Sequence, residues 1–253
     1  MTLVVTDAVV LHLFDYLESS RIVRLATREL GVQSAVARGA RRAKSRFGSS
    51  LDVFASGVVQ FAARPGRDLH NLTAFDLTRS RMALAANLAR FSGAAAIAEL
   101  ALAFAHGGPD DPVFDVLIDS LDALTEAPAE NAVDVGLASA WRIVAALGFA
   151  PSLSACAVCR AEIAAEDAAT FSHAAGGIVC GRCRSTVAVS RTLPPEARRA
   201  LEAWMGGGAS ARLGVGDRRA HLRLLREFLH YHLADGRELR ALAAWETSLR
   251  RGE

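Results

Sequence analysis

All four cysteines of the chain fall between residues 156 and 183, in the pattern C-x2-C-x20-C-x2-C. They are Cys156, Cys159, Cys180 and Cys183. Two residues between the cysteines of each pair allow a tight turn that presents both thiolates to one ion, and two such pairs complete a tetrahedron around zinc. The pattern therefore predicts one structural zinc ion, which folds residues 154–188 and leaves no coordination position open for catalysis.

Other roles for the cysteines agree less well with the surrounding sequence. Two disulfides would suit an oxidising compartment, but the N-terminal residues carry Asp7 inside an apolar run and no basic start, unlike a secretory signal. A redox-sensing dithiol at Cys180 and Cys183 would be expected in a βαβ pattern, which the sequence lacks, and it stays an alternative. His173 lies between the two pairs, but four thiolates already fill a tetrahedron, so we leave it out of the ligand set.

The first 79 residues show the apolar period of two that is typical of strands. Turn residues such as Gly31 separate five short runs, and no helical pattern comes between them. The five predicted strands cover residues 9–14, 20–27, 32–38, 51–63 and 69–78. Five strands in about 70 residues are too few for a sandwich and predict a small barrel such as the OB-fold.

After Thr78 the apolar period becomes helical. The predicted helices cover residues 84–100, 112–126, 131–147, 195–205 and 212–233. We therefore expect a multidomain α+β protein. Its expected parts are an OB-fold barrel (1–79), a first helical part (80–153), an inserted zinc module (154–188) and a second helical part (189–253).

One predicted helix carries acidic residues opposite its apolar face. The four are Asp115, Asp119, Asp122 and Glu126. Such a stripe is expected to be a solvated surface, and docking of a basic partner is the alternative.

The net charge of +2 hides a strong asymmetry along the chain. Residues 1–80 hold 11 Arg and Lys against 7 Asp and Glu, residues 81–155 hold 3 against 9, and residues 156–253 hold 15 against 11. Two basic segments flanking an acidic one suggest a polyanionic partner.

The densest basic run is ARGARRAKSRFG, residues 37–48. Its five cations are Arg38, Arg41, Arg42, Lys44 and Arg46. Arginine forks match phosphate oxygens in pairs, so contact with a nucleic-acid backbone is favoured over a solvated loop. Phe47 is the nearest aromatic residue, so base stacking is not evident from the sequence.

Motifs of common catalytic sites are missing from the sequence. There is no phosphate-binding G-x-x-x-x-G-K-[ST], no G-x-S-x-G and no H-E-x-x-H. His230 and His232 point away from each other on a helix and are expected to pack or to lie at the surface. The sequence therefore favours a binding protein over an enzyme. Its longest apolar run is too short and too charged for a membrane span, so we expect a cytoplasmic protein without membrane contact.

The stretch DAVVLHLFDYLESSRIVRLATRELGVQSAVARGARRAKSRFGSSLDVF resembles the N-terminal OB domain of the bacterial RecO recombination mediators. GFAPSLSACAVC, FSHAAGGIVCGRC and LHYHL resemble the same family's link into its zinc module, the module itself and its last helix. The resemblance covers nearly the whole chain in the correct order.

This resemblance implies a non-enzymatic, nucleoid-associated protein of DNA repair. Members bind single- and double-stranded DNA, anneal complementary strands, act with RecR, and help to load RecA onto DNA coated by single-stranded DNA-binding protein, whose C-terminal tail they bind. Carried over by position, the five cations of the basic run become DNA contacts and the four cysteines become zinc ligands. The alternative function is a zinc-stabilised adaptor whose basic loop docks an acidic protein.

Overall fold

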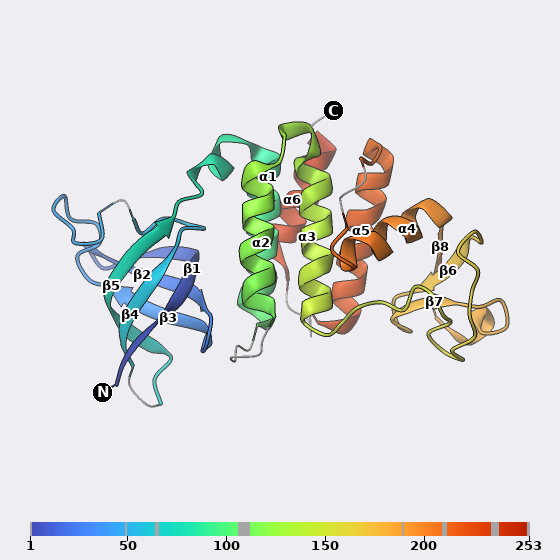
Figure 1. Cartoon of the computed structure of the whole chain (residues 1–253), viewed down its shortest axis with the longest axis horizontal. Helices are drawn as coiled ribbons and strands as arrows, with labels where there is room; N and C mark the ends of the chain where they lie inside the picture. The colour runs from blue at the N-terminus through green and yellow to red at the C-terminus, as the bar shows by residue number, and fades with distance from the viewer. Residues whose placement is uncertain are drawn as a thin grey trace.

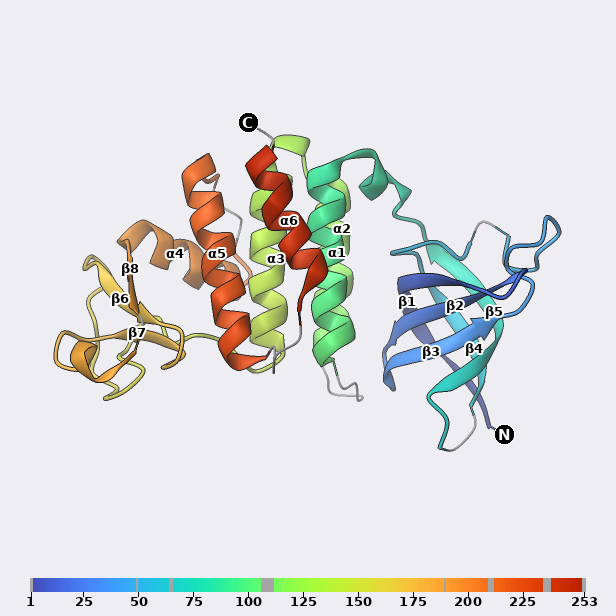
Figure 2. The ribbon, with the colours of Figure 1, turned by 180° about the vertical axis from the view of Figure 1, so that it is seen from behind.

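The computed structural model describes residues 2–48, 50–63, 66–105, 112–188, 190–208, 212–233 and 238–251. The molecule is elongated, with a β-barrel at one end, a small β-module at the other and a group of helices between them (Figure 1 and, from behind, Figure 2). It is thus an α+β protein with an N-terminal sheet and a helical C-terminal part.

The barrel consists of five strands that close in the order β1-β2-β3-β5-β4. Their bounds are β1 Thr2–Tyr16, β2 Ser20–Thr27, β3 Gly31–Ala37, β4 Ser56–Ala63 and β5 Leu69–Arg79. β3 and β5 pair in parallel, and the other pairs are antiparallel. Gly31 has φ +64°, the left-handed conformation that the β2–β3 turn requires. All five predicted strands are present.

The strand boundaries differ from the sequence prediction at two places. Residues 51–55 were predicted to start β4, but they form turns, and β4 begins only at Ser56. β1 is longer than predicted, since it begins at Thr2 and pairs with both β2 and β4. Near Leu11 its register with β2 shifts, and Val9, Val10 and Leu11 are all buried. Helices cover the outside of the barrel there, which removes the simple alternation of buried and exposed residues.

The helical body follows from the 3₁₀-helix η1, Met82–Ala86. Its helices are α1 Leu88–Phe104, α2 Val113–Glu126, α3 Ala132–Ala146, α4 Pro195–Met205, α5 Val215–His232 and α6 Arg240–Arg251, with η2 Ala129–Asn131 between α2 and α3. Asn87 caps α1 by accepting a hydrogen bond from the Arg90 backbone N–H at 3.0 Å. Among the helices that the structure describes, none combines the length and the apolar run that a bilayer crossing requires.

Helix α6 was missed by the sequence prediction, which placed the last helix at LHYHL. The segment LHYHL ends α5, and α6 follows it. Trp245 of α6 is fully buried and packs over Gly136 of α3, where an added Cβ would lie 2.9 Å from its ring. Gly93 of α1 faces Gly136 at the same place. The short contacts at these two glycines allow α1, α3 and α6 to pack closely.

The acidic stripe of α2 lies at the surface, as the sequence predicts for a solvated face, and only Asp122 is half-buried. Its residues also pair with arginines of the same chain. The closest contacts are Arg28–Asp115 at 2.9 Å, Arg142–Asp119 at 3.6 Å, Arg79–Asp122 at 2.6 Å, Arg79–Glu126 at 2.8 Å and Arg81–Asp122 at 2.7 Å. Arg28 and Arg79 come from the barrel strands or their turns, and Arg81 follows β5. The stripe therefore joins the helical body to the barrel.

Arg81 is the central residue of this joint. Its side chain is fully buried, and it donates hydrogen bonds to Asp122 at 2.7 Å, to the Phe54 carbonyl at 2.8 Å and to the Ser56 hydroxyl at 2.7 Å. One guanidinium thus connects α2, the turn before β4 and β4 itself. Three hydrogen bonds from Nε and Nη1 offset the cost of burying this guanidinium, while its Nη2 has no hydrogen-bond partner among the described residues.

The small module lies between α3 and α4 in the sequence. Its three short strands are β6 Ala169–Ser172, β7 Gly177–Val179 and β8 Ser190–Leu193, in the order β7-β6-β8, and the turn η3 Arg184–Thr186 lies before β8. Arg198 of α4 donates to the Ile163 carbonyl at 2.9 Å and also to the Ala164 carbonyl at 2.6 Å. The module is thereby attached to the helical body.

Candidate nucleic-acid interface and metal centre

The basic run leaves the end of β3 and crosses one rim of the barrel as a series of tight turns. Gly39 and Gly48 have φ +72° and +51°, so the two glycines of the run adopt the backbone angles that a chain reversal needs. Phe47 is buried in the barrel core and fixes the far end of the loop. The basic side chains are consequently displayed from a short, anchored loop.

The five predicted contact residues do not all point to the same place. Arg46 is committed to the fold, because it donates to the Leu72 carbonyl at 3.0 Å and stacks over the Phe47 ring at 4.9 Å. Arg41 lies 3.5 Å from the Asp15 carboxylate. Arg38, Arg42 and Lys44 are exposed, and no ion pair joins them to another residue in the part of the chain that the structure describes.

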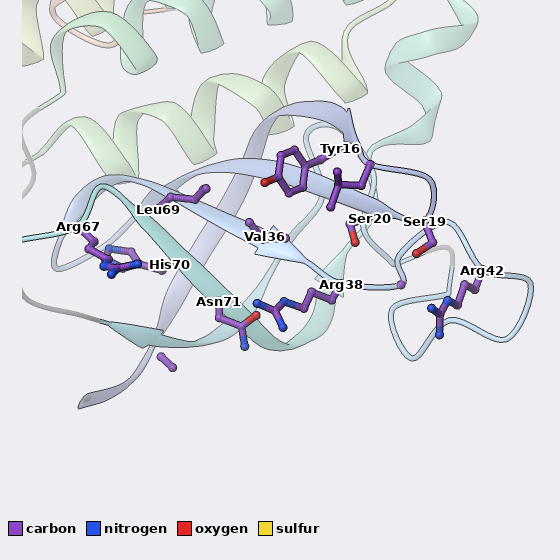
Figure 3. A pocket seen from close by; sticks show the side chains of 13 residues that line it. Tyr16, Ser19, Ser20, Val36, Arg38, Arg42, Arg67, Leu69, His70 and Asn71 are labelled. Carbon is purple, nitrogen blue, oxygen red and sulfur yellow. The ribbon is translucent and has the colours of Figure 1, made fainter.

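Arg38 and Arg42 line a groove of about 690 Å³ on the barrel surface. Figure 3 shows Arg38 in the middle of this groove, Arg42 on the loop at one side, and Arg67 and His70 at the other side. The β1–β2 turn contributes Tyr16, Leu17, Ser19 and Ser20. We call this surface the barrel groove. It combines three guanidinium groups with an aromatic ring and an imidazole.

Sequence reasoning missed Tyr16, Arg67 and His70. Arg67 and His70 come from the β4–β5 connection and the start of β5, about 30 residues from the basic run. His70 stacks on Phe61 with ring centroids 5.1 Å apart, and it lies 3.0 Å from the Gln33 side-chain oxygen. The parallel pairing of β3 with β5 brings these residues beside Arg38. The signal that could have found them is the rule that the β1–β2 and β4–β5 loops of an OB barrel border its ligand face.

The four cysteines converge on one point of the small module. Their Sγ atoms all lie within 4.8 Å of one another, and those of Cys159 and Cys180 are 3.7 Å apart. A tetrahedron with zinc–sulfur bonds of about 2.3 Å has sulfur–sulfur edges of about 3.8 Å. None of the four is in a disulfide. The spacing of the sulfur atoms fits a four-thiolate metal centre.

The pKa values of two of the four clustered thiols are shifted in opposite directions. Burial raises the pKa of Cys156, but backbone N–H groups, Cys159 first among them, lower it to about 6. A hydrogen bond with the Cys159 side chain and partial desolvation raise the pKa of Cys183 to about 12. Four sulfur atoms this close share protons, since they cannot all ionise beside one another without a cation. A divalent ion would remove that conflict.

His173 does not belong to the four-cysteine group, in agreement with the prediction that it is not a ligand. It is buried, and its Nε2 lies 3.0 Å from the Glu227 carboxylate of α5. Desolvation lowers the pKa of His173. His232 Nε2 lies 2.7 Å from the His173 carbonyl oxygen, whereas His230 is exposed. His173 and His232 thus attach the module to α5, in agreement with a packing role for His232 and a surface position for His230.

Two family models match the chain. The model described as "Recombination protein O N terminal" matches residues 1–81, and the one described as "Recombination protein O C terminal" matches residues 85–241. The chain belongs to the RecO family. The boundary between the two matches lies at the joint between the barrel and the helices. The residues of the barrel groove fall in the N-terminal match, and the four cysteines fall in the C-terminal match.

Curated RecO relatives agree over most of their length. The chain is 37% identical to the DNA repair protein RecO of Anaeromyxobacter dehalogenans (strain 2CP-C) over 92% of each chain. It is 36% identical to that of Rubrobacter xylanophilus over 73% of each, and 34% identical to that of Streptomyces griseus subsp. griseus over 93% of this chain and 96% of the relative. The predicted RecO resemblance is confirmed.

Proposed function

We propose that this RecO-family chain is a non-enzymatic DNA-binding protein of DNA repair, which anneals complementary strands and, with RecR, helps to load RecA onto DNA coated by single-stranded DNA-binding protein. Its curated relatives are named DNA repair proteins, which supports the repair role. The five-stranded barrel, with its order β1-β2-β3-β5-β4, is the OB domain in this proposal.

The observation that carries the proposal is the barrel groove. Arg38, Arg42 and Arg67 lie along it, and their guanidinium groups suit the phosphates of a nucleic acid. Tyr16 and His70 add flat rings on which bases can stack. The groove therefore offers both a charged track and stacking partners, which an extended single strand requires.

Annealing follows from charge neutralisation. Two DNA strands repel each other through their phosphates, and cations that neutralise one backbone lower that repulsion. Contacts to phosphates carry no sequence information, so complementary pairing supplies the specificity. Such a step needs no nucleotide hydrolysis and no catalytic residue.

The zinc centre has a structural role in the proposal. Cys156, Cys159, Cys180 and Cys183 would hold one Zn²⁺ through all four coordination positions, and the bound ion would supply folding energy rather than chemistry. We propose residues 154–188 as the extent of this zinc module, with the barrel at 1–79 and the helical parts at 80–153 and 189–253.

Salt-dependent DNA binding tests the groove. Arg46 donates to the Leu72 carbonyl and Arg41 is paired at the surface with Asp15, so we propose Arg38, Arg42, Lys44 and Arg67 as the main phosphate contacts. At about −0.7 per contact on a single strand, these four cations should contribute roughly −2.8 to the log–log salt slope, of which the three arginines of the groove contribute roughly −2.1. The double variant Arg38→Glu/Arg42→Glu should bind less tightly, with a slope shallower by roughly 1.4.

The matched control reverses two exposed arginines of the helical body, Arg199→Glu/Arg240→Glu. This control should keep the wild-type affinity and slope. Equal behaviour of the two double variants would contradict the groove assignment and favour the adaptor function. Annealing of strands precoated with single-stranded DNA-binding protein, measured with and without RecR, then tests the partners.

A further inference from the structure

The surface of the barrel groove continues across the outside of three neighbouring strands. β1, β2 and β3 lie side by side in the barrel (Figure 2). Val23 of β2 and Ala35 of β3 are buried in the barrel core. Because successive side chains of a strand point to opposite faces, the residues on either side of Val23 and Ala35 point outward.

The strand register places three apolar side chains in one row on this outer face. Val36, which lines the groove (Figure 3), is paired with Ile22 of β2, and Ile22 is paired with Phe14 of β1. Directly opposed residues of neighbouring strands have Cβ atoms about 4.5 to 5.5 Å apart, so the row is continuous. Phe14 is 45% exposed although it is a large apolar residue. We call Phe14, Ile22 and Val36 the apolar row.

A second ring and an arginine adjoin the apolar row. His12 stacks on Phe14, with ring centroids 4.1 Å apart and an interplanar angle of 27°. His12 is also paired across the strands with Arg24 of β2. No ion pair engages Arg24 within the described part of the chain. The outward residues between the groove and Arg24 include no carboxylate, and they are His12, Phe14, Ile22, Ser34 and Val36.

We propose that an unpaired DNA strand leaves the barrel groove across β3, β2 and β1, with its bases on the apolar row and a phosphate on Arg24. Exposed apolar patches with a polar border mark interaction sites, and the flat face of a base can cover such a patch and stack on the Phe14 ring. Two observations favour a nucleic acid over a protein. The row is continuous with a groove that carries three arginines, and it is free of the negative charge that would repel phosphates.

This inference rests on the proposed function and deepens it, because it names the unpaired strand as the ligand of the barrel. In a duplex the bases are stacked inside and their faces are covered, so a duplex could use the arginines of the groove but not the apolar row. The row should therefore add affinity for single strands alone.

The surface beyond Arg24 changes its charge. A hollow of about 850 Å³ lies there, between the barrel and the helical body, and two glutamates line it. Glu99 accepts two hydrogen bonds from backbone N–H groups at the start of α6, and Glu238 lies 3.5 Å from Arg240. Carboxylates repel phosphates, so the DNA contact should end at Arg24. The row spans three strands about 4.8 Å apart, or about 10 Å in all, which adds only a short piece of strand to the groove.

The test compares two lengths of fluorescein-labelled oligothymidylate on the full-length chain, with affinity measured by anisotropy. Strands of about 4 and about 15 nucleotides cover the range of site sizes known for OB folds. The short strand should stay in the groove, where three arginines hold it, whereas the long strand should also reach the row. Phe14→Ala should weaken binding of the long strand about fivefold or more and leave the short strand unchanged. The matched control is Leu77→Ala, at a position of β5 that is 43% exposed and outside this face, and it should change neither affinity.

Two further variants separate a DNA contact from a general effect on the barrel. Phe14→Tyr keeps the ring and should keep the wild-type affinity. Arg24→Gln should make the log–log salt slope of the long strand shallower by roughly 0.7, without a change for the short strand.

Three results would overturn the inference: an unchanged affinity of Phe14→Ala for the long strand, an equal loss on both lengths, or an equal loss on a duplex of the longer length. The first of these would leave the outer face to a protein partner. The groove itself is tested separately, because an unchanged affinity of Arg38→Glu/Arg42→Glu would contradict the proposed function whatever Phe14→Ala does.

Discussion

The barrel and the four-cysteine module occupy opposite ends of the molecule, and each is held together by different means. The barrel closes on itself, and in the part that the structure describes its strands have no free edges and thirteen buried apolar residues fill it. The module has an open sheet whose strands are only four, three and four residues long. Such a sheet is too small to be stable alone. Apolar burial thus stabilises the inside of the barrel, whereas the module has little apolar core and is expected to depend on its four-cysteine cluster and its anchors to the helices.

Loss of the metal centre should show the largest difference between the two ends. Structural zinc sites contribute apparent folding energies of about 10 to 16 kcal/mol. Cys180→Ser, or treatment of the protein with a strong chelator, should therefore remove hydrogen-exchange protection from residues 154–188 and leave the barrel protected. Retained protection in the module after the metal has been stripped would mean that the four thiols need no ion.

Disruption of the joint between the barrel and the helical body should have the second-largest effect. Arg81→Met removes three hydrogen bonds from a buried guanidinium while Asp122 keeps its contact with Arg79. We expect a loss of about 3 kcal/mol in the free energy of unfolding, measured by urea denaturation. Arg79→Gln is the control, because the Arg79 side chain is itself exposed and ion pairs at the surface are each worth less than about 1 kcal/mol. If Arg81→Met and Arg79→Gln lose the same free energy of unfolding, the buried hydrogen bonds of Arg81 are not what holds the barrel to the helices.

Acid should weaken the module end through His221. Burial, opposed in part by Asp217 and Asp134, lowers its folded pKa to about 4 from an unfolded value of 6.5. The unfolded chain therefore binds more protons between these values, so stability is fully present above pH 6.5 and is lost as the pH falls through 4. At 1.36 kcal/mol per unit, the loss is about 3 kcal/mol.

His221→Phe should remove this part of the pH dependence. The difference in unfolding free energy between the wild type and the variant should change by about 3 kcal/mol from pH 6.5 to pH 4. Because acid also protonates the cysteines of both proteins, only the difference between them reports on His221. A constant difference over this range would show that His221 titrates normally.

Most of the fold could be predicted from the spacing of residues that are near one another in the sequence. The alternation in residues 20–27 and the helical spacing in residues 195–205 depend on neighbours in sequence, and both elements appear with the predicted bounds. The cysteine spacing succeeded for the same reason, since each pair forms its own turn. The alternation in β1 was less informative, because Val9 and Leu11 face the helices while Val10 faces the barrel core.

Contacts between distant segments could not be predicted in the same way. The acidic residues of α2 have the spacing of a solvated stripe, and only the barrel's position reveals Arg28 and Arg79 opposite them. Arg67 reaches the groove through the pairing of β3 with β5. Helix α6 was missed although Leu242, Trp245 and Leu249 recur at helical spacing, so in this case the local pattern was present in the sequence. For the acidic stripe and for Arg67, the deciding partner lies far away in the sequence.

Four residues of the barrel are buried against the helices, and this limits where the chain can be cut into separate domains. Val9, Leu11, Ala26 and Phe54 belong to the barrel but are buried in the helical core. A fragment ending near residue 80 would expose these apolar side chains to water, so it would tend to aggregate before its DNA binding could be measured. The same constraint applies to chimaeras. A barrel taken from a relative should work on these helices only if its outward-facing residues at these four positions are exchanged as a set.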